Sequence, residues 1–290
     1  MKRSRIAALA LLAACSAACS PKSGPAAPVA GNSAAGQVQT HAPLETQPKA
    51  LLRTIFPAGR IVEDNVSFGI VHASGKGEYH LMMLASTKTF ADGRLVAVVS
   101  GARCGADGDP ESEHGASTVN VYTMRRQDGT WRVVERHEQV ADSGSFGNGG
   151  DVKWVALGPG KEGFVVSSQY WDIDMNAIHG DADVFELAGG VRHLGGIPQM
   201  QDVARGCSPE HGVCTDAHGL LHVADEPVDG PYRDLVLDFT GRRYTVTTNG
   251  DEEGHDKVEH LQAQLRESAR YRFNGEGFVL VSGSTPLPGP

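Results

Sequence analysis

Short stretches in which apolar and polar residues alternate recur along most of the chain. Each is bounded by Gly, Asp or Asn, and each has the length of a strand rather than of a helix. Parallel βαβ units would need helical patterns of about ten to fifteen residues between them, and these are missing. The pattern predicts an all-β fold of antiparallel strands, with candidates at 66–73, 78–86, 95–101, 117–124, 130–138, 152–157, 163–170, 182–187, 191–194, 220–224, 235–239, 243–247, 269–273 and 277–281.

Turn residues connect several of these stretches directly. An Asp-Gly pair at Asp128, a Gly-Gly pair at Gly189 and an Asn-Gly pair at Asn274 supply the positive φ angles of tight hairpins. Gly241 lies between two further stretches and predicts a fourth hairpin. The hairpin units are spaced more widely than the ~40–50 residues of a propeller blade. We therefore predict a single hairpin-rich domain, for which an irregular propeller-like array and a large sandwich or barrel both stay open.

One stretch near the C-terminus has the period of a helix. Val258, Leu261 and Leu265 are spaced i, i+3 and i+7, Asp256 stands at an N-cap position, and Glu259 follows three residues later. This spacing predicts one short C-terminal amphipathic helix from Asp256 to Leu265, which covers the sheet before the last hairpin.

The first residues have the organisation of a secretory leader. Three basic residues precede a nine-residue apolar run at 6–14, which is too short to span a bilayer. The run ends in Leu-Ala-Ala-Cys at 12–15, and this segment resembles the lipobox of bacterial lipoproteins. The resemblance implies cleavage before Cys15 and attachment of palmitate-type acyl chains to it, which anchor a protein stably in a membrane. Cys19 is the competing attachment residue, but it lacks the large apolar residue three positions upstream.

The residues after this cysteine predict a location and a linker. Ser16 stands where the lipoprotein family carries Asp as its inner-membrane retention signal, so the resemblance implies the outer membrane, on its periplasmic face. Residues 21–50 are rich in Ala, Pro, Gly, Ser and Gln and contain no aromatic residue, which is typical of a disordered tether. We predict a signal peptide at 1–14, a lipid-anchored tether at 15–50 and one all-β domain at 51–290.

Composition and charge narrow the classes of partner. The 290 residues include 36 Gly, in keeping with many turns, and the formal net charge is −9. The leader carries three of the 26 basic residues and none of the 35 acidic ones, so its removal makes the balance −12. An acidic chain is repelled by nucleic acid and by anionic membrane surfaces. We predict no nucleic-acid partner, and membrane contact through the lipid alone.

Three cysteines lie in the predicted domain. Cys207 and Cys214 enclose a turn-rich segment, and disulfides are stable in an oxidising compartment, so we predict that these two pair. Cys104 is left over or is an alternative partner. The same region also contains His211, His218 and His222. Two thiolates and two imidazoles can bind zinc, but the spacing matches no known zinc motif, and residues four apart on an extended segment stand ~13 Å apart. We predict neither a metal nor a cofactor.

An oxygen-rich segment runs from Asp172 to Asp183. Its oxygen side chains occupy positions 1, 3, 5 and 12 of a calcium loop, but Ala177 stands where an EF-hand requires Gly, and Asp183 where it requires Glu. Calcium binding at this segment stays open. We interpret a second acidic segment, at 105–113, as a solvated loop.

No segment has the signature of a catalytic nucleophile or of a phosphate loop. Ser145 lies among glycines, but Ser143 occupies the position where a nucleophile elbow needs its first Gly. The Gly-rich residues 147–151 lack the lysine of a phosphate loop. We therefore predict no catalytic residue.

These features together favour a non-enzymatic binding module for a protein or a cell-envelope component. One form of it is an immunity or inhibitor protein that caps an envelope-degrading enzyme. Residues 232–241 also resemble segments of uncharacterised β-rich bacterial periplasmic proteins, a resemblance that carries no site. The alternative is a cell-envelope hydrolase whose site is assembled from dispersed His, Asp and Glu residues.

Overall fold

The computed structural model describes residues 48–63, 68–74, 77–109, 111, 115–145, 149–174, 176–203, 206–226, 230–249 and 256–287. These residues belong to one unit, which spans Ala42–Pro290. The predicted signal peptide, Cys15, Cys19 and most of the predicted tether lie outside the described residues. None of the helices described is long and apolar enough to cross a membrane.

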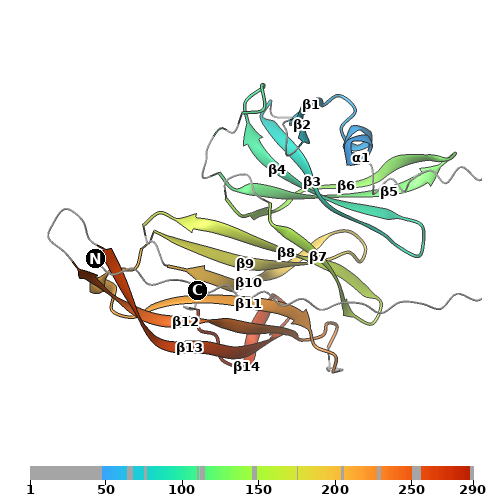
Figure 1. The fold of residues 1–290 in the computed structure, drawn as a ribbon. Coiled ribbons are helices and arrows are strands. Elements are labelled where there is room, and N and C mark those ends of the chain that lie inside the picture. Colours follow the sequence, from blue (N-terminus) through green and yellow to red (C-terminus); the bar gives the residue numbers. More distant parts are fainter. Residues whose placement is uncertain are drawn as a thin grey trace, which may run out of the picture. The chain divides into compact units, whose positions relative to one another are not determined.

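Antiparallel strands make up most of the described chain, which confirms the predicted all-β class. They form a six-stranded and an eight-stranded sheet (Figure 1). The six-stranded sheet contains β1 (Arg60–Glu63), β2 (Phe68–Ala73), β3 (Tyr79–Thr89), β4 (Leu95–Cys104), β5 (Ser117–Gln127) and β6 (Thr130–Ser143). The eight-stranded sheet contains β7 (Asp151–Gly158), β8 (Lys161–Asp172), β9 (Ala177–Glu186), β10 (Arg192–Asp202), β11 (Cys214–Val223), β12 (Leu235–Asn249), β13 (Asp256–Phe273) and β14 (Phe278–Gly283).

Both sheets are simple meanders in which the strands lie side by side in chain order. Every pairing is therefore between strands that follow one another in the sequence, as the hairpin-rich pattern predicts. Turn spacing left a propeller-like array and a large sandwich or barrel open. The described strands form two sheets of unequal size rather than a ring of similar blades, which favours the sandwich over the propeller-like array.

Three of the four predicted hairpins are confirmed. Asp128 (φ 51°) joins β5 to β6, Gly189 (φ 69°) joins β9 to β10, and Gly275 (φ 109°) joins β13 to β14. The fourth prediction is wrong, because Gly241 lies inside β12, between β11 and β13. A Cβ at this position would collide with the backbone oxygen of Asp216. This glycine permits a close approach of backbones rather than a turn.

The predicted C-terminal helix is also wrong, because the segment from Asp256 to Leu265 is the first part of β13. β13 pairs with β12 over almost the whole length of both strands, with a bulge opposite Arg243. Leu265 is buried at 5% exposure, whereas Leu261 is 57% exposed, so the helical spacing does not define one buried face. A long partner strand that bonds this segment along one side outweighs its modest helix propensity.

The α-helix of the described chain lies at its other end, as α1 (Pro48–Ile55). It begins three residues before the predicted start of the domain, within the segment that we assign to the tether. Proline is tolerated in the first turn of a helix, and Leu51, Leu52 and Ile55 are fully buried against the six-stranded sheet. Their burial explains why these residues are ordered despite the polar composition before them.

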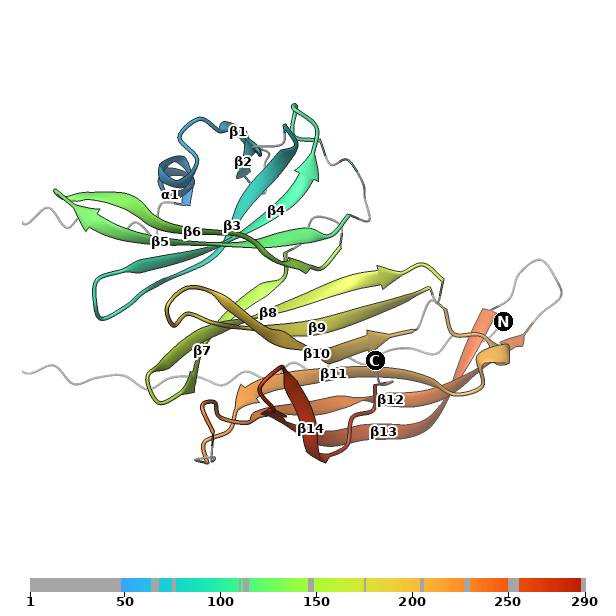
Figure 2. The ribbon, with the colours of Figure 1, turned by 180° about the vertical axis from the view of Figure 1, so that it is seen from behind.

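Strand β4 separates two hydrophobic cores. Leu95, Ala97 and Val99 pack with α1 on one face, whereas Val96 and Val98 contact the eight-stranded sheet on the other. Figures 1 and 2 accordingly show α1 on the face of the six-stranded sheet that points away from β7–β14. The core between the sheets is completed by Val119, Val121, Phe164, Val166, Phe185 and Leu187. Because both faces of β4 are buried, its sequence is a continuous apolar run rather than an alternating one.

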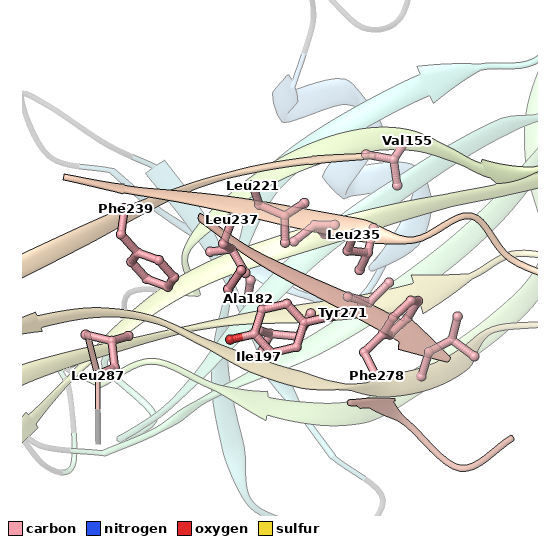
Figure 3. Close-up of a cluster of buried hydrophobic side chains, with 14 of the residues drawn as sticks. Val155, Ala182, Ile197, Leu221, Leu235, Leu237, Phe239, Tyr271, Phe278 and Leu287 are labelled. Carbon is pink, nitrogen blue, oxygen red and sulfur yellow. The ribbon is translucent and has the colours of Figure 1, made fainter. Parts of the chain in front are cut away.

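The eight-stranded sheet curls around a core of its own. Figure 3 shows side chains from β7 to β14, among them Val155, Leu221 and Phe278, pointing into one shared interior. β7 and β14 stand at opposite edges of the sheet, so a cluster with members from both requires strong curvature. The Lys153 ammonium of β7 donates to the carbonyl oxygen of Leu221 in β11 at 2.9 Å, which holds this curvature across the interior.

Candidate functional site

The face of the six-stranded sheet that carries α1 is covered over only part of its area. α1 packs against β4 at residues 95–99, and toward residues 101–103 the strands hold a cavity of about 530 Å³, here called the β3–β6 pocket. The pocket is lined by Glu78, His80, Gly101, Ala102, Arg103, Glu111, Gly115, Ala116, Thr118, Gln139 and Asp142. A smaller cavity of about 80 Å³ shares His80, Thr118 and Gln139 with it.

Strand register explains why the pocket is hollow. Met82, Gly101, Thr118 and Asp142 form one row across β3, β4, β5 and β6, and paired residues of antiparallel strands point to the same face. Gly101 contributes no side chain to this row. A Cβ there would lie 2.9 Å from both the Met82 sulfur and the Thr118 hydroxyl oxygen. The glycine therefore keeps the floor of the pocket open.

A buried amide holds a strained backbone at one wall of the pocket. Asn120 of β5 is 2% exposed, and its Oδ1 accepts a hydrogen bond from the backbone N–H of Gln139 at 2.9 Å. The Asn120 Nδ2 donates to the Val99 carbonyl oxygen at 3.3 Å and to the Thr118 hydroxyl at 3.1 Å. Gln139 lies in a bulge of β6 and has a φ of 54°, which is rare for a residue other than Gly. Bulges of this kind turn a side chain toward a new direction.

His80 is the buried titratable group of the pocket. Its side chain is 9% exposed, and its Nε2 has no hydrogen-bond partner among the described residues. The nearest carboxylate oxygen, Oε2 of Glu78, lies 3.9 Å away. Burial lowers the pKa of His80 below 6.5; the charges of Arg103 and His72 act in the same direction, whereas those of Glu78 and Glu111 oppose it. The neutral form of the imidazole therefore predominates at pH 7, and this form can accept a hydrogen bond at one ring nitrogen.

The charges of the pocket are predominantly negative. Arg103, its cationic side chain, forms an ion pair with Glu78. Glu111 and Asp142 also line the pocket, and neither side chain forms an ion pair with another described residue. An open pocket with two carboxylates that no described residue neutralises favours a ligand that is positively charged.

The predicted disulfide is confirmed, since Cys207 and Cys214 are bonded with their Cα atoms 6.1 Å apart. Both sulfurs are thus consumed, and the alternative zinc set loses its thiolates. His218 and His222 are exposed on the outer face of β11, four residues apart on one strand. Cys104 is a free, buried thiol, and burial raises its pKa.

The segment from Asp172 to Asp183 does not form the loop that calcium binding requires. β8 ends at Asp172, which pairs with Ala177, and β9 then continues past Asp183. Ends that lie at different positions along a pair of extended strands do not enclose one ion. No group of three metal-binding side chains is found among the residues described.

Histidine and carboxylate side chains meet elsewhere in the domain without a nucleophile. His193 Nε2 lies 2.8 Å from Asp183 Oδ1, but in the described part of the chain no serine or cysteine bonds to this imidazole. Ser145 accepts a hydrogen bond from the backbone N–H of Trp171 at 3.2 Å, and Ser143 donates to a loop carbonyl at 3.4 Å. Both serines thus stabilise the connection between the two sheets.

Most residues of the β3–β6 pocket were not foreseen from the sequence. Glu111 belongs to the acidic segment 105–113, but His80, Gln139 and Asp142 have no local signature. The one available signal is Asn120, an amide within an apolar strand, because a buried polar group needs a specific partner. Comparisons with protein-family models, with curated proteins and with solved structures found no match.

Proposed function

We propose that this protein is a lipoprotein anchored at the periplasmic face of the outer membrane, and that its domain is a binding module. The lipobox-like residues at 12–15 support the anchor at Cys15. The β3–β6 pocket is the site that receives the bound group. One observation carries this function: a strained Gln139 and a buried His80, whose Nε2 has no partner among the described residues, line the same open pocket.

Both features lower the stability of the folded state. A non-glycine residue at positive φ costs about 1–2 kcal/mol, and a buried nitrogen without a hydrogen-bond partner costs about 1–3 kcal/mol. Such costs are typical of binding and catalytic sites, where a ligand supplies the missing contact. Their coincidence at one cavity supports a site rather than two unrelated imperfections.

The geometry favours binding over hydrolysis. His80 lies near Glu78 in the pocket, as the alternative of an envelope hydrolase requires. A covalent mechanism also needs an activated nucleophile. The Thr118 hydroxyl is engaged, because it donates to the Gly101 carbonyl oxygen at 3.1 Å. Binding needs no group beyond those that line the pocket.

Location and charge suggest the class of partner. An acidic module at the periplasmic face meets proteins that enter the envelope, and its balance of −12 without the leader attracts basic surfaces. We propose an immunity or inhibitor function in which the domain covers a basic region of an incoming protein. Another basic component of the envelope would be recognised by the same chemistry.

Affinity capture with a sterically blocked pocket tests this function. Ala116 is exposed and lines the pocket, so Ala116→Trp fills it without removing a charge. Ala91, exposed in the turn between β3 and β4, provides the matched control Ala91→Trp. Full-length tagged protein in detergent is incubated with envelope extract, and folding of each variant is verified by circular dichroism. We expect the wild type and Ala91→Trp to retain the same partner, and Ala116→Trp to lose it.

Equal capture by Ala116→Trp would contradict the pocket as the binding site. Capture of no partner, together with turnover of a peptidoglycan, lipid or ester substrate by the purified protein, would replace the binding module by the hydrolase.

A further inference from the structure

The hydrogen-bonding groups that the β3–β6 pocket leaves available are mostly acceptors. The carboxylates of Glu111 and Asp142 are exposed in the pocket, and neither side chain has a partner among the described residues. Ionised carboxylates only accept hydrogen bonds. A ligand that binds here has to bring donors.

Apart from the Gln139 side-chain amide, the side-chain donors in and beside the pocket are engaged by the protein itself. Arg103 is paired with Glu78. The Thr118 hydroxyl donates to a backbone carbonyl, and the Asn120 amide donates to the Val99 carbonyl oxygen at 3.3 Å. Few side-chain donors remain for an anionic ligand, which would also face two carboxylates that no described residue neutralises. The pocket therefore disfavours phosphate, carboxylate and nucleic acid.

His80 is a second, independent indication of a donor ligand. Its side chain is more than nine-tenths buried and lines both cavities, yet its Nε2 lacks a partner among the described residues. A neutral imidazole accepts a hydrogen bond at one ring nitrogen. In the tautomer that carries its proton on Nδ1, Nε2 is the acceptor, and a cation with N–H groups then satisfies this atom and the carboxylates together.

Size distinguishes an organic cation from a metal ion. In the described part of the chain, no three His, Cys, Asp or Glu side chains lie close enough to hold a metal. A cavity of about 530 Å³ accepts a group of side-chain size. Guanidinium presents five N–H donors in a planar fork and ammonium presents three, which matches acceptors that are spread over several strands.

We infer that the β3–β6 pocket binds a guanidinium or primary ammonium group, with Glu111 and Asp142 as its charged acceptors and His80 as a neutral one. This inference rests on the proposed function and names the chemistry of its ligand. The cation is either the Arg or Lys side chain of a basic protein or a free amine.

Calorimetric titration of the full-length protein in detergent tests the inference. The probes are agmatine, as a free guanidinium compound, and the peptide Gly-Arg-Gly with both ends blocked. The neutral control is the same peptide with citrulline in place of Arg. We expect binding of at least one guanidinium probe to be about tenfold or more stronger than that of the citrulline peptide, because charge-assisted hydrogen bonds are lost in the latter. Preference for the peptide indicates a protein side chain, and preference for agmatine indicates a free amine.

Matched charge variants locate the site. E111Q combined with D142N removes two carboxylates of the pocket, whereas E276Q combined with D225N removes two exposed carboxylates elsewhere. We expect the first pair to weaken guanidinium binding about tenfold or more and the second to leave it within about twofold. In the wild type, the ¹⁵N chemical shift of the His80 imidazole should move on titration.

Equal affinity for the arginine and citrulline peptides, or unchanged affinity in E111Q/D142N, would overturn the inference. The proposed function is judged separately. If Ala116→Trp abolishes partner capture while no cation binds, the ligand class is wrong and the pocket remains the binding site. If Ala116→Trp does not affect capture, the proposed function itself fails.

Discussion

Two residues of β3 and β5 combine burial with polarity. Asn120 is fully engaged, and through the Gln139 amide it fixes the bulge of β6. His80 is also buried, but its Nε2 has no hydrogen-bond partner among the described residues. The first residue therefore stabilises the wall of the pocket, whereas the Nε2 of the second is left without a partner in the described part of the chain. The role of Asn120 is therefore tested by substitution, and that of His80 by the dependence of stability on pH.

Replacement of Asn120 should destabilise the domain. Asn120→Ala leaves the Gln139 N–H and three oxygen acceptors without their partner, so we expect the free energy of unfolding to fall by about 2–3 kcal/mol. Asn274→Ala is the control, because Asn274 caps an exposed turn, and it should cost less than about 1 kcal/mol. Urea denaturation measures both. Equal losses in the two variants would contradict a structural role of Asn120 in the bulge.

His80 should make stability depend on pH. Its pKa is lowered in the folded state, mainly by burial, with Arg103 and His72 assisting and Glu78 and Glu111 opposing. Between the folded pKa and 6.5 the unfolded chain binds more protons, so stability falls as the pH falls through this range.

Urea denaturation at pH 7.5 and pH 5.0 measures this dependence. We expect the wild type to lose more stability between the two values than His80→Asn, in which the group no longer titrates. An identical loss in both proteins would show that His80 titrates normally. The other histidines are common to both proteins and cancel in the comparison.

At the scale of elements, the β12–β13 ribbon shows how pairing overrides local preference. The residues from Asp256 to Leu265 have helical spacing and an N-cap residue, but β12 offers a continuous partner strand. Similarly, Gly241 is of a residue type that is common in turns, but it lies within β12, where three strands approach closely. The wrong helix and the wrong hairpin were both predicted in this ribbon. Propensity describes an isolated segment and not the neighbouring strand against which it packs.

The two leucines of this ribbon distinguish strand from helix. Leu265 is 5% exposed and Leu261 57% exposed in β13, although both would face the core in the predicted helix. Leu265→Ala should lower the free energy of unfolding by about 2–4 kcal/mol, and Leu261→Ala by less than about 0.5 kcal/mol. Thermal or urea denaturation of both variants provides the measurement. Comparable losses would favour the helix.

At the scale of the whole molecule, the sheets are joined by a small apolar core and a few polar contacts. Phe164 and Phe185 stack with their centroids 4.7 Å apart within this core. The Trp154 Nε1 donates to the Ser86 hydroxyl at 2.9 Å and links β7 to β3. These contacts join the sheet that carries the pocket to the larger sheet. They leave the α1 face of the six-stranded sheet, and with it the pocket, unobstructed by β7–β14.

The proposed anchor gives a prediction for the whole protein in cells. Incorporation of labelled palmitate should be lost in Cys15→Ser and retained in Cys19→Ser, because only Cys15 follows a large apolar residue at the lipobox position. Metabolic labelling followed by immunoprecipitation is the measurement. The reverse result would move the attachment to Cys19, and labelling of both variants would exclude either cysteine as the unique site.

Local pattern was sufficient for the features that depend on near neighbours. Alternation and turn residues predicted an all-β chain and three hairpins, and the short spacing of Cys207 and Cys214 predicted their disulfide. A turn or a short disulfide loop depends on a few consecutive residues, whose preferences the sequence states directly.

The pocket, the strand β13 and the curled core depended on residues far apart in the chain. His80 and Asp142 line one cavity only because four strands pair in a particular register. Leu261 and Leu265 belong to the same local pattern, yet only one of them finds a core to enter. Burial and electrostatic surroundings are properties of contacts rather than of residue types, and those contacts exist only after the strands have paired.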